Sequence, residues 1–560
     1  MATLDVPPQL GSVAINGDST DPVAHHRHLY PKSNLSLEDR FIDEPRRLRV
    51  AVIGGGLAGI LAGILLPVKV PGIDLVIYDK NKDVGTEIRD YWQALARTYD
   101  VYGKVKLETK VEDIAWDVEE SVWSLQVRDL KRDTVSLQKA DFVLPAIGRF
   151  NAWKLPDIPG ISEYNGHLRH ASNWDPSFDP SGRSVAVIGN GASGIQLVPN
   201  LQRLVTRLDH YARNKTWIAA SWAGDERTFD AQPFSEEQKQ SFKDPETYLG
   251  FRKQLEDKYW RRFGAFFRAS PENKEAQKNF TQMMMDRLRN KPELLERLIP
   301  DFSPNCRRLT PGPGYLEAIT EDNVHYIQTP IKSITATGIE TTDGEKRDVD
   351  AIICATGANI DMTPAFSIRA HGVDLKAAWK ADGQFGFPYT YLGLATPGFP
   401  NLLFIHGPHG TGPSGTVPHS VEIQLTYYAK VLRKAAREGI RSITPSRKAA
   451  DEFVEYSDAF FAKTVLSDNC SSWYNSGRPG SRIHGVWPGS GGHVTAVRRE
   501  PRWEDWEYEY LSDSGNRFAW YFGNGWTRKE TDPQSDAASY LKLPSEIDLR
   551  DLHESWWSLP

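Results

Sequence analysis

Short apolar runs and longer stretches of helical spacing alternate along the first part of the chain. The runs Leu48–Ile53 and Asp74–Tyr78 flank a longer apolar stretch, Leu57–Leu66. Short apolar runs bounded by turn residues are typical of buried strands, and a longer apolar stretch between them favours a helix. The sequence therefore predicts a strand, a helix and a second strand that form one α/β unit.

The pattern returns further along the chain. Residues 184–218 predict a second α/β unit, with its second strand at Leu204–Ala212. Residues 235–299 are charged and carry apolar anchors at helical spacing, which predicts a helical insertion that packs on the protein rather than binding a cofactor. The apolar runs Ala351–Ala355 and Leu402–Ile405 predict two more strands.

Strict alternation marks a third kind of segment between the two units. Val111–Asp117, Val122–Val127 and Val135–Leu137 alternate apolar and polar residues and are separated by short polar turns. This spacing predicts a small antiparallel insertion. Phe142–Ile147 then predicts a return to a buried strand.

The turn between the first strand and the first helix is rich in glycine. Its glycines are Gly54, Gly55, Gly56 and Gly59. Glycines spaced G-x-G-x-x-G allow a tight turn, let the backbone approach a pyrophosphate and let helix and strand pack closely. Asp79 follows the next strand, where a carboxylate can accept hydrogen bonds from ribose hydroxyls. This order predicts a dinucleotide site.

The second unit carries the same turn, with Gly189, Gly191, Ser193 and Gly194. Its second strand ends without an acidic residue and is followed by Arg213 and Lys215. A 2′-phosphate requires cations where a free ribose requires an acceptor, so this unit favours NADPH over NADH. Two such turns in one polypeptide predict two nucleotide cofactors and hydride transfer from a nicotinamide to a flavin.

The segment just before the second glycine turn carries a more specific motif. Tyr164, Gly166, His170 and Trp174 form the pattern aromatic-x-Gly-x-x-x-His-x-x-x-Trp. This pattern resembles the fingerprint of Baeyer–Villiger monooxygenases, in which the histidine has a conformational role between the two domains. The resemblance extends from about residue 38 to beyond residue 530.

The resemblance also implies roles for residues outside the glycine turns. Arg308 matches the active-site arginine of the family, and Arg307 matches a neighbouring cation near the nicotinamide nucleotide. Gly357 resembles the glycine at the strand end of the domain junction, and Trp473 matches a segment that lines the substrate pocket. Val111 is expected among the FAD-binding residues. Several later segments are similar to fungal members that act on secondary metabolites.

The activity implied by this resemblance is insertion of one oxygen atom of O2 into a ketone. In the family, NADPH reduces FAD, reduced flavin captures O2 as a peroxide, and the peroxide attacks the ketone to give an ester or lactone. A fixed cation such as Arg308 would stabilise the negative charge that develops. The expected partners are therefore a small-molecule ketone and O2, with no protein partner predicted.

One segment departs from the family pattern. After Gly85 the family has a long segment that wraps the flavin ring and supplies a carboxylate near the active-site arginine. In this chain Glu87 already resembles the sequence that follows it. Three explanations are open: a skipped exon, a degenerate member that still binds nucleotides, or an enzyme with a remodelled flavin pocket.

Composition and charge exclude several other classes of function. The 560 residues are 40% hydrophobic and 25% charged, with a net charge of −6. Such a chain has no global basic field for nucleic acid or an anionic membrane. The apolar stretch Leu61–Val70 is too short to span a bilayer. With no secretory signal, and with Cys306, Cys354 and Cys470 too dispersed for a disulfide framework or a metal cluster, we expect a cytoplasmic protein.

These observations predict an α/β protein with two Rossmann-like dinucleotide-binding domains and a helical insertion. The expected ranges are a mobile arm (1–46), an FAD-binding domain (47–150 and 345–480), an NADP-binding domain (151–344) and a Trp-rich C-terminal cap (481–560). Two alternative functions are N- or S-oxygenation by the same cofactors, and a nucleotide-binding pseudoenzyme. Trp174 and Arg308 argue against the first, and the missing segment supports the second.

Overall fold

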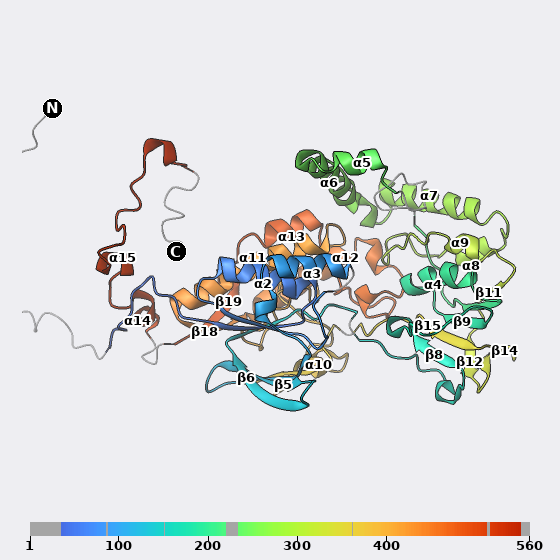
Figure 1. The fold of residues 1–560 in the computed structure, drawn as a ribbon, viewed down its shortest axis with the longest axis horizontal. Helices are drawn as coiled ribbons and strands as arrows, with labels where there is room; N and C mark the ends of the chain where they lie inside the picture. Colours follow the sequence, from blue (N-terminus) through green and yellow to red (C-terminus); the bar gives the residue numbers. More distant parts are fainter. Residues whose placement is uncertain are drawn as a thin grey trace, which may run out of the picture.

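The computed structural model describes residues 35–85, 88–150, 152–219, 233–360, 362–511 and 516–549. Most of the predicted N-terminal arm lies outside the described residues, and so do Thr86 and Glu87 at the shortened segment. The two α/β units lie side by side along the long axis of the molecule (Figure 1).

The first unit is a parallel sheet with the order β3-β2-β1-β7. Its strands are β1 (Arg49–Ile53), β2 (Asp74–Tyr78), β3 (Val105–Lys106) and β7 (Phe142–Pro145). The predicted helix is α2 (Leu57–Lys69), which continues through Pro67, and α3 (Arg89–Thr98) follows β2. The four residues of β7 are all buried, as expected for a strand covered on both faces.

The predicted antiparallel insertion is present. β4 (Thr109–Asp117), β5 (Val122–Asp129) and β6 (Thr134–Ala140) pair in antiparallel register. β16 (Ser367–Ala370) joins β4 in parallel, and β17 (Val373–Asp374) leads into α10 (Leu375–Trp379). In Figure 1 β5 and β6 lie below the first sheet, and α2 and α11 lie above it.

The second unit is a parallel sheet with the order β11-β10-β9-β15-β8. Its elements are β8 (His167–His170), β9 (Ser184–Ile188), α4 (Ala192–Gln202), β10 (Arg207–Tyr211), α9 (Tyr315–Ala318), β11 (Val324–Ile327) and β15 (Ala351–Cys354). Because β15 pairs with both β8 and β9, the proposed boundary at residue 345 is wrong at this point. The chain returns to the first unit after Cys354, where β16 pairs with β4.

Both predicted α/β units and the predicted helical insertion are present, which confirms the fold class. The insertion consists of α5 (Glu236–Ser241), α6 (Pro245–Trp260), α7 (Pro271–Arg287) and α8 (Leu294–Leu298). β12 (Ile331–Ile334), β13 (Gly338–Thr341) and β14 (Lys346–Asp348) form a small antiparallel sheet before β15. α5 and α6 bury no residue and project from the body (Figure 1).

The C-terminal part returns to the first unit. Its elements are α11 (Val417–Glu438), β18 (Ile440–Pro445), α12 (Arg447–Phe461), α13 (Gly491–Val497), β19 (Trp506–Tyr510), α14 (Arg517–Phe522) and α15 (Arg528–Thr531). α11 packs against α2, and β19 pairs with β18. The predicted strand Leu402–Ile405 lies beside β7. The Leu403 and Ile405 N–H groups donate to the carbonyls of Val143 and Pro145, and Leu402 and Val143 form a parallel β-bridge.

The Trp-rich cap divides into a packed and an exposed part. Trp487 and Trp506 are buried in the main core, whereas Trp526 is 54% exposed. α14 contacts the C-terminal end of α11, whereas α15 lies away from the body in Figure 1, and Trp556 and Trp557 lie outside the described residues. Among the described residues no helix is long and apolar enough to cross a membrane.

Candidate active site

The first glycine turn leaves an open backbone surface at the start of α2. Gly54 has φ +117°, and a Cβ on Gly59 would overlap the Gly54 carbonyl. A Cβ on Gly56 would meet nothing within 4 Å. No side chain caps the helix at Gly56, so its first N–H groups face this open space and can bind an anion.

Asp79 closes one side of the same turn. The Gly55 N–H donates to Asp79 Oδ2 at 2.6 Å, and the Asn81 N–H donates to Asp79 Oδ1 at 2.7 Å. The Thr109 N–H donates to the Asp79 carbonyl, which brings the start of β4, and with it Val111, to this end of the sheet. Sequence-predicted residues of the first nucleotide site therefore meet at the carboxyl ends of parallel strands.

The second glycine turn repeats this geometry. Gly189 has φ +108°, a Cβ on Gly194 would overlap the Gly189 carbonyl, and a Cβ on Gly191 would meet nothing within 4 Å. Ser193 lies exposed in the first turn of α4, which begins without a side-chain cap. Both glycine turns have the shape of a phosphate cradle.

Three cations gather beside the second turn. The Asn190 amide donates to the carbonyl of Asn214, which lies between Arg213 and Lys215. The Arg307 guanidinium donates to the Lys215 carbonyl at 2.9 Å. Arg213, Lys215 and Arg307, predicted from separate parts of the sequence, therefore share one edge of the second sheet.

The histidine motif joins this sheet to the domain junction. His170 Nδ1 accepts from the Ser172 N–H, so Nε2 carries the proton and donates to the Gly357 carbonyl at 3.1 Å. Burial lowers the pKa of His170 and favours this neutral form. Gly357 has φ +91°, which favours glycine. The hydrogen bond from His170 to Gly357 connects the end of β8 with the segment after β15, which fits a conformational role between two domains.

Two other residues of the motif have local explanations. A Cβ on Gly166 would overlap the hydroxyl of Tyr164, which donates to the Val349 carbonyl at 2.7 Å. Trp174 is 40% exposed and touches Phe178 edge-on. Gly166, His170 and Trp174 do not line the cavity described next.

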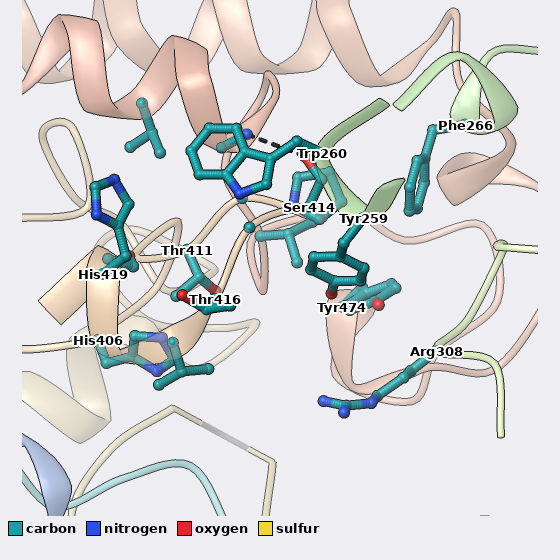
Figure 2. Close-up of a pocket in the computed structure, with 18 of the residues that line it drawn as sticks. Tyr259, Trp260, Phe266, Arg308, His406, Thr411, Ser414, Thr416, His419 and Tyr474 are labelled. Atoms are coloured by element: carbon teal, nitrogen blue, oxygen red, sulfur yellow. Dashed lines mark hydrogen bonds between the residues drawn. The ribbon is translucent and has the colours of Figure 1, made fainter. Parts of the chain in front are cut away.

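A cavity of about 510 Å³ lies where the two units meet the C-terminal segment. Arg308 and Trp473, which the sequence placed in the active site, both line it. Figure 2 shows Arg308 below Tyr259 and Tyr474. Tyr259 belongs to α6, so the C-terminal end of this helix of the insertion also lines the cavity. Helical spacing identifies a face but does not show what that face covers.

The cavity is strongly cationic. The arginines that line it are Arg149, Arg307, Arg308 and Arg498, and the described lining contains no Asp or Glu. Among the described residues Arg308 has no hydrogen-bond or ion-pair partner. Its exposed side chain lines the cavity. Burial raises the pKa of Tyr474 to about 12, while Arg308 opposes that shift. A fixed cation in such a place stabilises a developing oxyanion.

Arg149 and Arg498 are held by carbonyl groups instead of carboxylates. Arg149 donates to the carbonyls of His406, Gly407 and Gly485 and to the Thr411 hydroxyl, and it stacks over Trp473. Arg498 donates to the carbonyls of Leu392, His409 and Gly410. Burial lowers the pKa of each arginine to about 10, so both remain charged near neutral pH.

The sequence analysis missed Arg149, His406, Arg498 and the start of α11. Thr416 and Val417 line the cavity at that helix terminus, which has no side-chain cap. A signal was present, because residues 407–415 are rich in glycine and proline and precede a long amphipathic helix. No spacing rule connects Arg149 with Arg498, because only the fold brings them together.

The cysteines are not all separate, contrary to the sequence analysis. Cys306 and Cys470 form a disulfide with their Cα atoms 6.4 Å apart. They are separated by 164 positions in the sequence, so their spacing gave no sign of pairing. The bridge joins the segment of Arg307 and Arg308 to the segment of Trp473. Among the described residues no group of side chains forms a metal site.

Known proteins share this sequence and fold. No family model matches the chain. It is 30% identical over 544 residues to the FAD-binding monooxygenase tazF of Aspergillus terreus, which covers 89% of this chain and 95% of that protein. It is 28% identical over 506 residues to a Baeyer-Villiger monooxygenase of Pseudomonas aeruginosa, covering 81% and 90%. Cyclohexanone monooxygenase from Rhodococcus sp. Phi1 bound to NADP+ has a TM-score of 0.69 and 21% identity, covering 83% and 100%.

The disulfide gives a direct chemical prediction. The unfolded chain should show one free thiol, Cys354, without a reductant and three thiols after reduction. Burial raises the pKa of Cys354 to about 12, so the folded chain should show no rapidly reacting thiol. Thiol titration in denaturant measures both numbers. Three thiols without reductant would contradict the bridge.

Proposed function

The chain belongs to the family of FAD-binding monooxygenases, and we propose that it uses FAD and NADPH to insert one oxygen atom of O2 into a ketone, giving an ester or lactone. The cationic cavity between the two nucleotide-type units carries this proposal, because it unites two cofactor cradles with a fixed positive charge. The fungal relative tazF supports a role in secondary metabolism.

The residues present fit both cofactors. FAD fits the first unit, where Gly56 leaves the backbone open to a pyrophosphate and Asp79 stands at the ribose position. NADPH fits the second unit, where Gly191 leaves the same opening and cations replace the acid. FAD, when bound, supplies the reduction of O2 with electrons from NADPH.

The protein residues then act on the ketone. Arg308 lines the cavity without a carboxylate partner and is placed to stabilise negative charge that develops on the ketone oxygen. Trp473 and Tyr474 form an aromatic wall that excludes water. Their positions are held by the disulfide at Cys470 and by the stacking of Arg149 on Trp473.

Ketone and thioether substrates distinguish this proposal from N- or S-oxygenation. The purified chain, loaded with FAD and NADPH, is incubated with a panel of ketones and a matched panel of thioethers. Ester or lactone formation with an increase of one oxygen atom is the expected result. Sulfoxides without any ester would favour the alternative activity.

Loss of the cavity cation should remove oxygenation without removing cofactors. Arg308→Ala should lower kcat for ester formation roughly 100- to 1,000-fold, the effect of deleting one oxyanion-stabilising group. FAD binding should stay within a few-fold of the parent chain. The control is Arg433→Ala, which removes an exposed arginine of α11 outside the cavity. Equal losses in both variants would contradict the role of Arg308.

The cations at the second turn should select NADPH. Changing both Arg213 and Lys215 to Ala should raise KM for NADPH roughly 10- to 100-fold, since a hydrogen bond to a charged group contributes about 1.5–3 kcal/mol. KM for NADH, which lacks the 2′-phosphate, should change little. Steady-state oxidation of each nucleotide measures the two constants. A parallel rise for NADH would point to a general loss of binding.

The shortened segment after Gly85 should uncouple NADPH oxidation from ester formation. The family segment that is missing wraps the flavin ring, so water should reach the site more readily. We expect NADPH oxidation that releases hydrogen peroxide in excess of ester. Simultaneous measurement of NADPH, peroxide and product tests this. One ester per NADPH, with no peroxide, would contradict it, and reading the transcript across residues 85–87 would show whether an exon was skipped.

The remaining expectations stay predictions. The domain ranges, apart from the corrected boundary at residue 345, stay predictions that limited proteolysis would test. A cytoplasmic location is still proposed, and the thiol titration bears on it because stable disulfides are rare in reducing compartments.

A further inference from the structure

His406 occupies an unusual position in the wall of the cavity. It lines the cavity on the side opposite Arg308 in the view of Figure 2. Its Nε2 atom is buried and has no hydrogen-bond partner, and among the described residues neither ring nitrogen is bonded. A buried polar group without a partner destabilises the folded chain. A ligand in the cavity that bonds this ring would remove that cost.

Nearby buried histidines do not share this feature. His409 Nε2 bonds the Ile483 carbonyl at 3.2 Å. His484 bonds the Ser476 hydroxyl through Nε2 and the Arg482 carbonyl through Nδ1. The same region of the fold thus satisfies its other imidazoles with protein partners. His406 is the one of these three that faces the cavity.

The backbone of His406 is fixed in a strained conformation. Its φ is +62°, in the left-handed region that residues other than glycine rarely adopt. The His406 N–H donates to Gln424 Oε1 at 3.0 Å, and Arg149 Nε donates to the His406 carbonyl at 3.3 Å. Gln424 is fully buried. The side chains of Gln424 and Arg149 therefore fix the backbone of His406 at the wall of the cavity.

The surrounding charges determine what the imidazole can do. Burial lowers the pKa of His406 well below its usual value, and Arg149 and Arg498 lower it further. The ring is therefore neutral near neutral pH, with one N–H donor and one acceptor nitrogen. A ketone offers only an acceptor, its carbonyl oxygen, and the flavin ring also presents carbonyl oxygens.

We propose that His406 is a ligand-binding residue whose imidazole N–H donates a hydrogen bond to a carbonyl oxygen of the molecule bound in the cavity. The carbonyl belongs either to the ketone substrate or to the flavin ring. Arg149 and Gln424 act as positioning residues for this contact. The inference rests on the proposed function for the ketone, but its flavin arm needs no turnover.

Two substitutions at His406 test the proposal. His406→Leu removes the donor at similar volume, and His406→Gln keeps an N–H donor. The control is His325→Leu, which changes an exposed histidine of β11. Each chain is prepared without flavin, titrated with FAD by fluorescence, and then titrated with cyclohexanone and a panel of larger ketones by the absorbance of bound FAD.

His406→Leu should weaken the binding of one ligand roughly two- to tenfold, as expected for the loss of one hydrogen bond. His406→Gln should bind that ligand with nearly the affinity of the parent chain. Weaker FAD binding identifies the flavin carbonyl. Weaker ketone binding with unchanged FAD binding identifies the substrate. If no ketone in the panel perturbs the flavin spectrum, the FAD titration alone decides.

Thermal unfolding of the ligand-free chains separates this role from a structural one. His406→Leu should raise Tm by roughly 1–2 °C, because an unpartnered polar group is replaced by an apolar one. A residue needed only for packing would lower Tm instead. The proposal is overturned if His406→Leu fails to fold, or if it binds FAD and every ketone as the parent chain does. If the parent chain oxygenates no substrate, the proposed function is wrong. The effect of His406→Leu on FAD binding can still be interpreted in that case.

Discussion

The active-site cavity depends on buried guanidinium groups whose partners are backbone carbonyls. Arg149 connects the segment after β7 with the loop before α11 and with the segment of Gly485. Arg498 connects α13 to the same loop. Carboxylate partners would satisfy these arginines equally well but would cancel their charge. Carbonyl partners satisfy the N–H groups and leave a positive field in the cavity.

This field explains why several other groups are arranged as they are. Burial lowers the pKa of His406 and the field of the arginines lowers it further, while the same field opposes the rise in the pKa of Tyr474 that burial causes. The described lining of the cavity contains no Asp or Glu, so no carboxylate in that lining offsets the charge of the arginines.

The fold could be predicted from sequence where local rules dominate. The two glycine turns, their flanking strands and the antiparallel insertion follow from periodicity and glycine spacing, because each is set by neighbours in the chain. Leu402–Ile405 is apolar and lies beside β7, to which its backbone is hydrogen-bonded, so here too the local pattern indicated an extended segment. The predicted boundary at residue 345 was wrong because β15 pairs within the second sheet. The sequence of β15 alone does not show which sheet the strand joins.

The site was predictable only in part, for the same reason. Arg308 and Trp473 were predicted through family resemblance, and both line the cavity. The roles of Arg213 and Lys215, predicted from their position after a strand, stay predictions. Other features of the site depend on residues far apart in sequence. They are the Cys306–Cys470 disulfide, the hydrogen bonds of Arg149 to backbone carbonyls, and the unpartnered ring of His406. Such contacts follow from the packing of several elements at once, and a single sequence does not reveal them.

Flavin stoichiometry of the purified 560-residue chain tests the central claim most directly. The chain is incubated with FAD, freed of unbound cofactor and examined by absorbance before and after NADPH is added. The account predicts close to one FAD per chain, reduced by NADPH. A folded chain that retains no flavin would contradict it and would identify this sequence as a truncated or degenerate form.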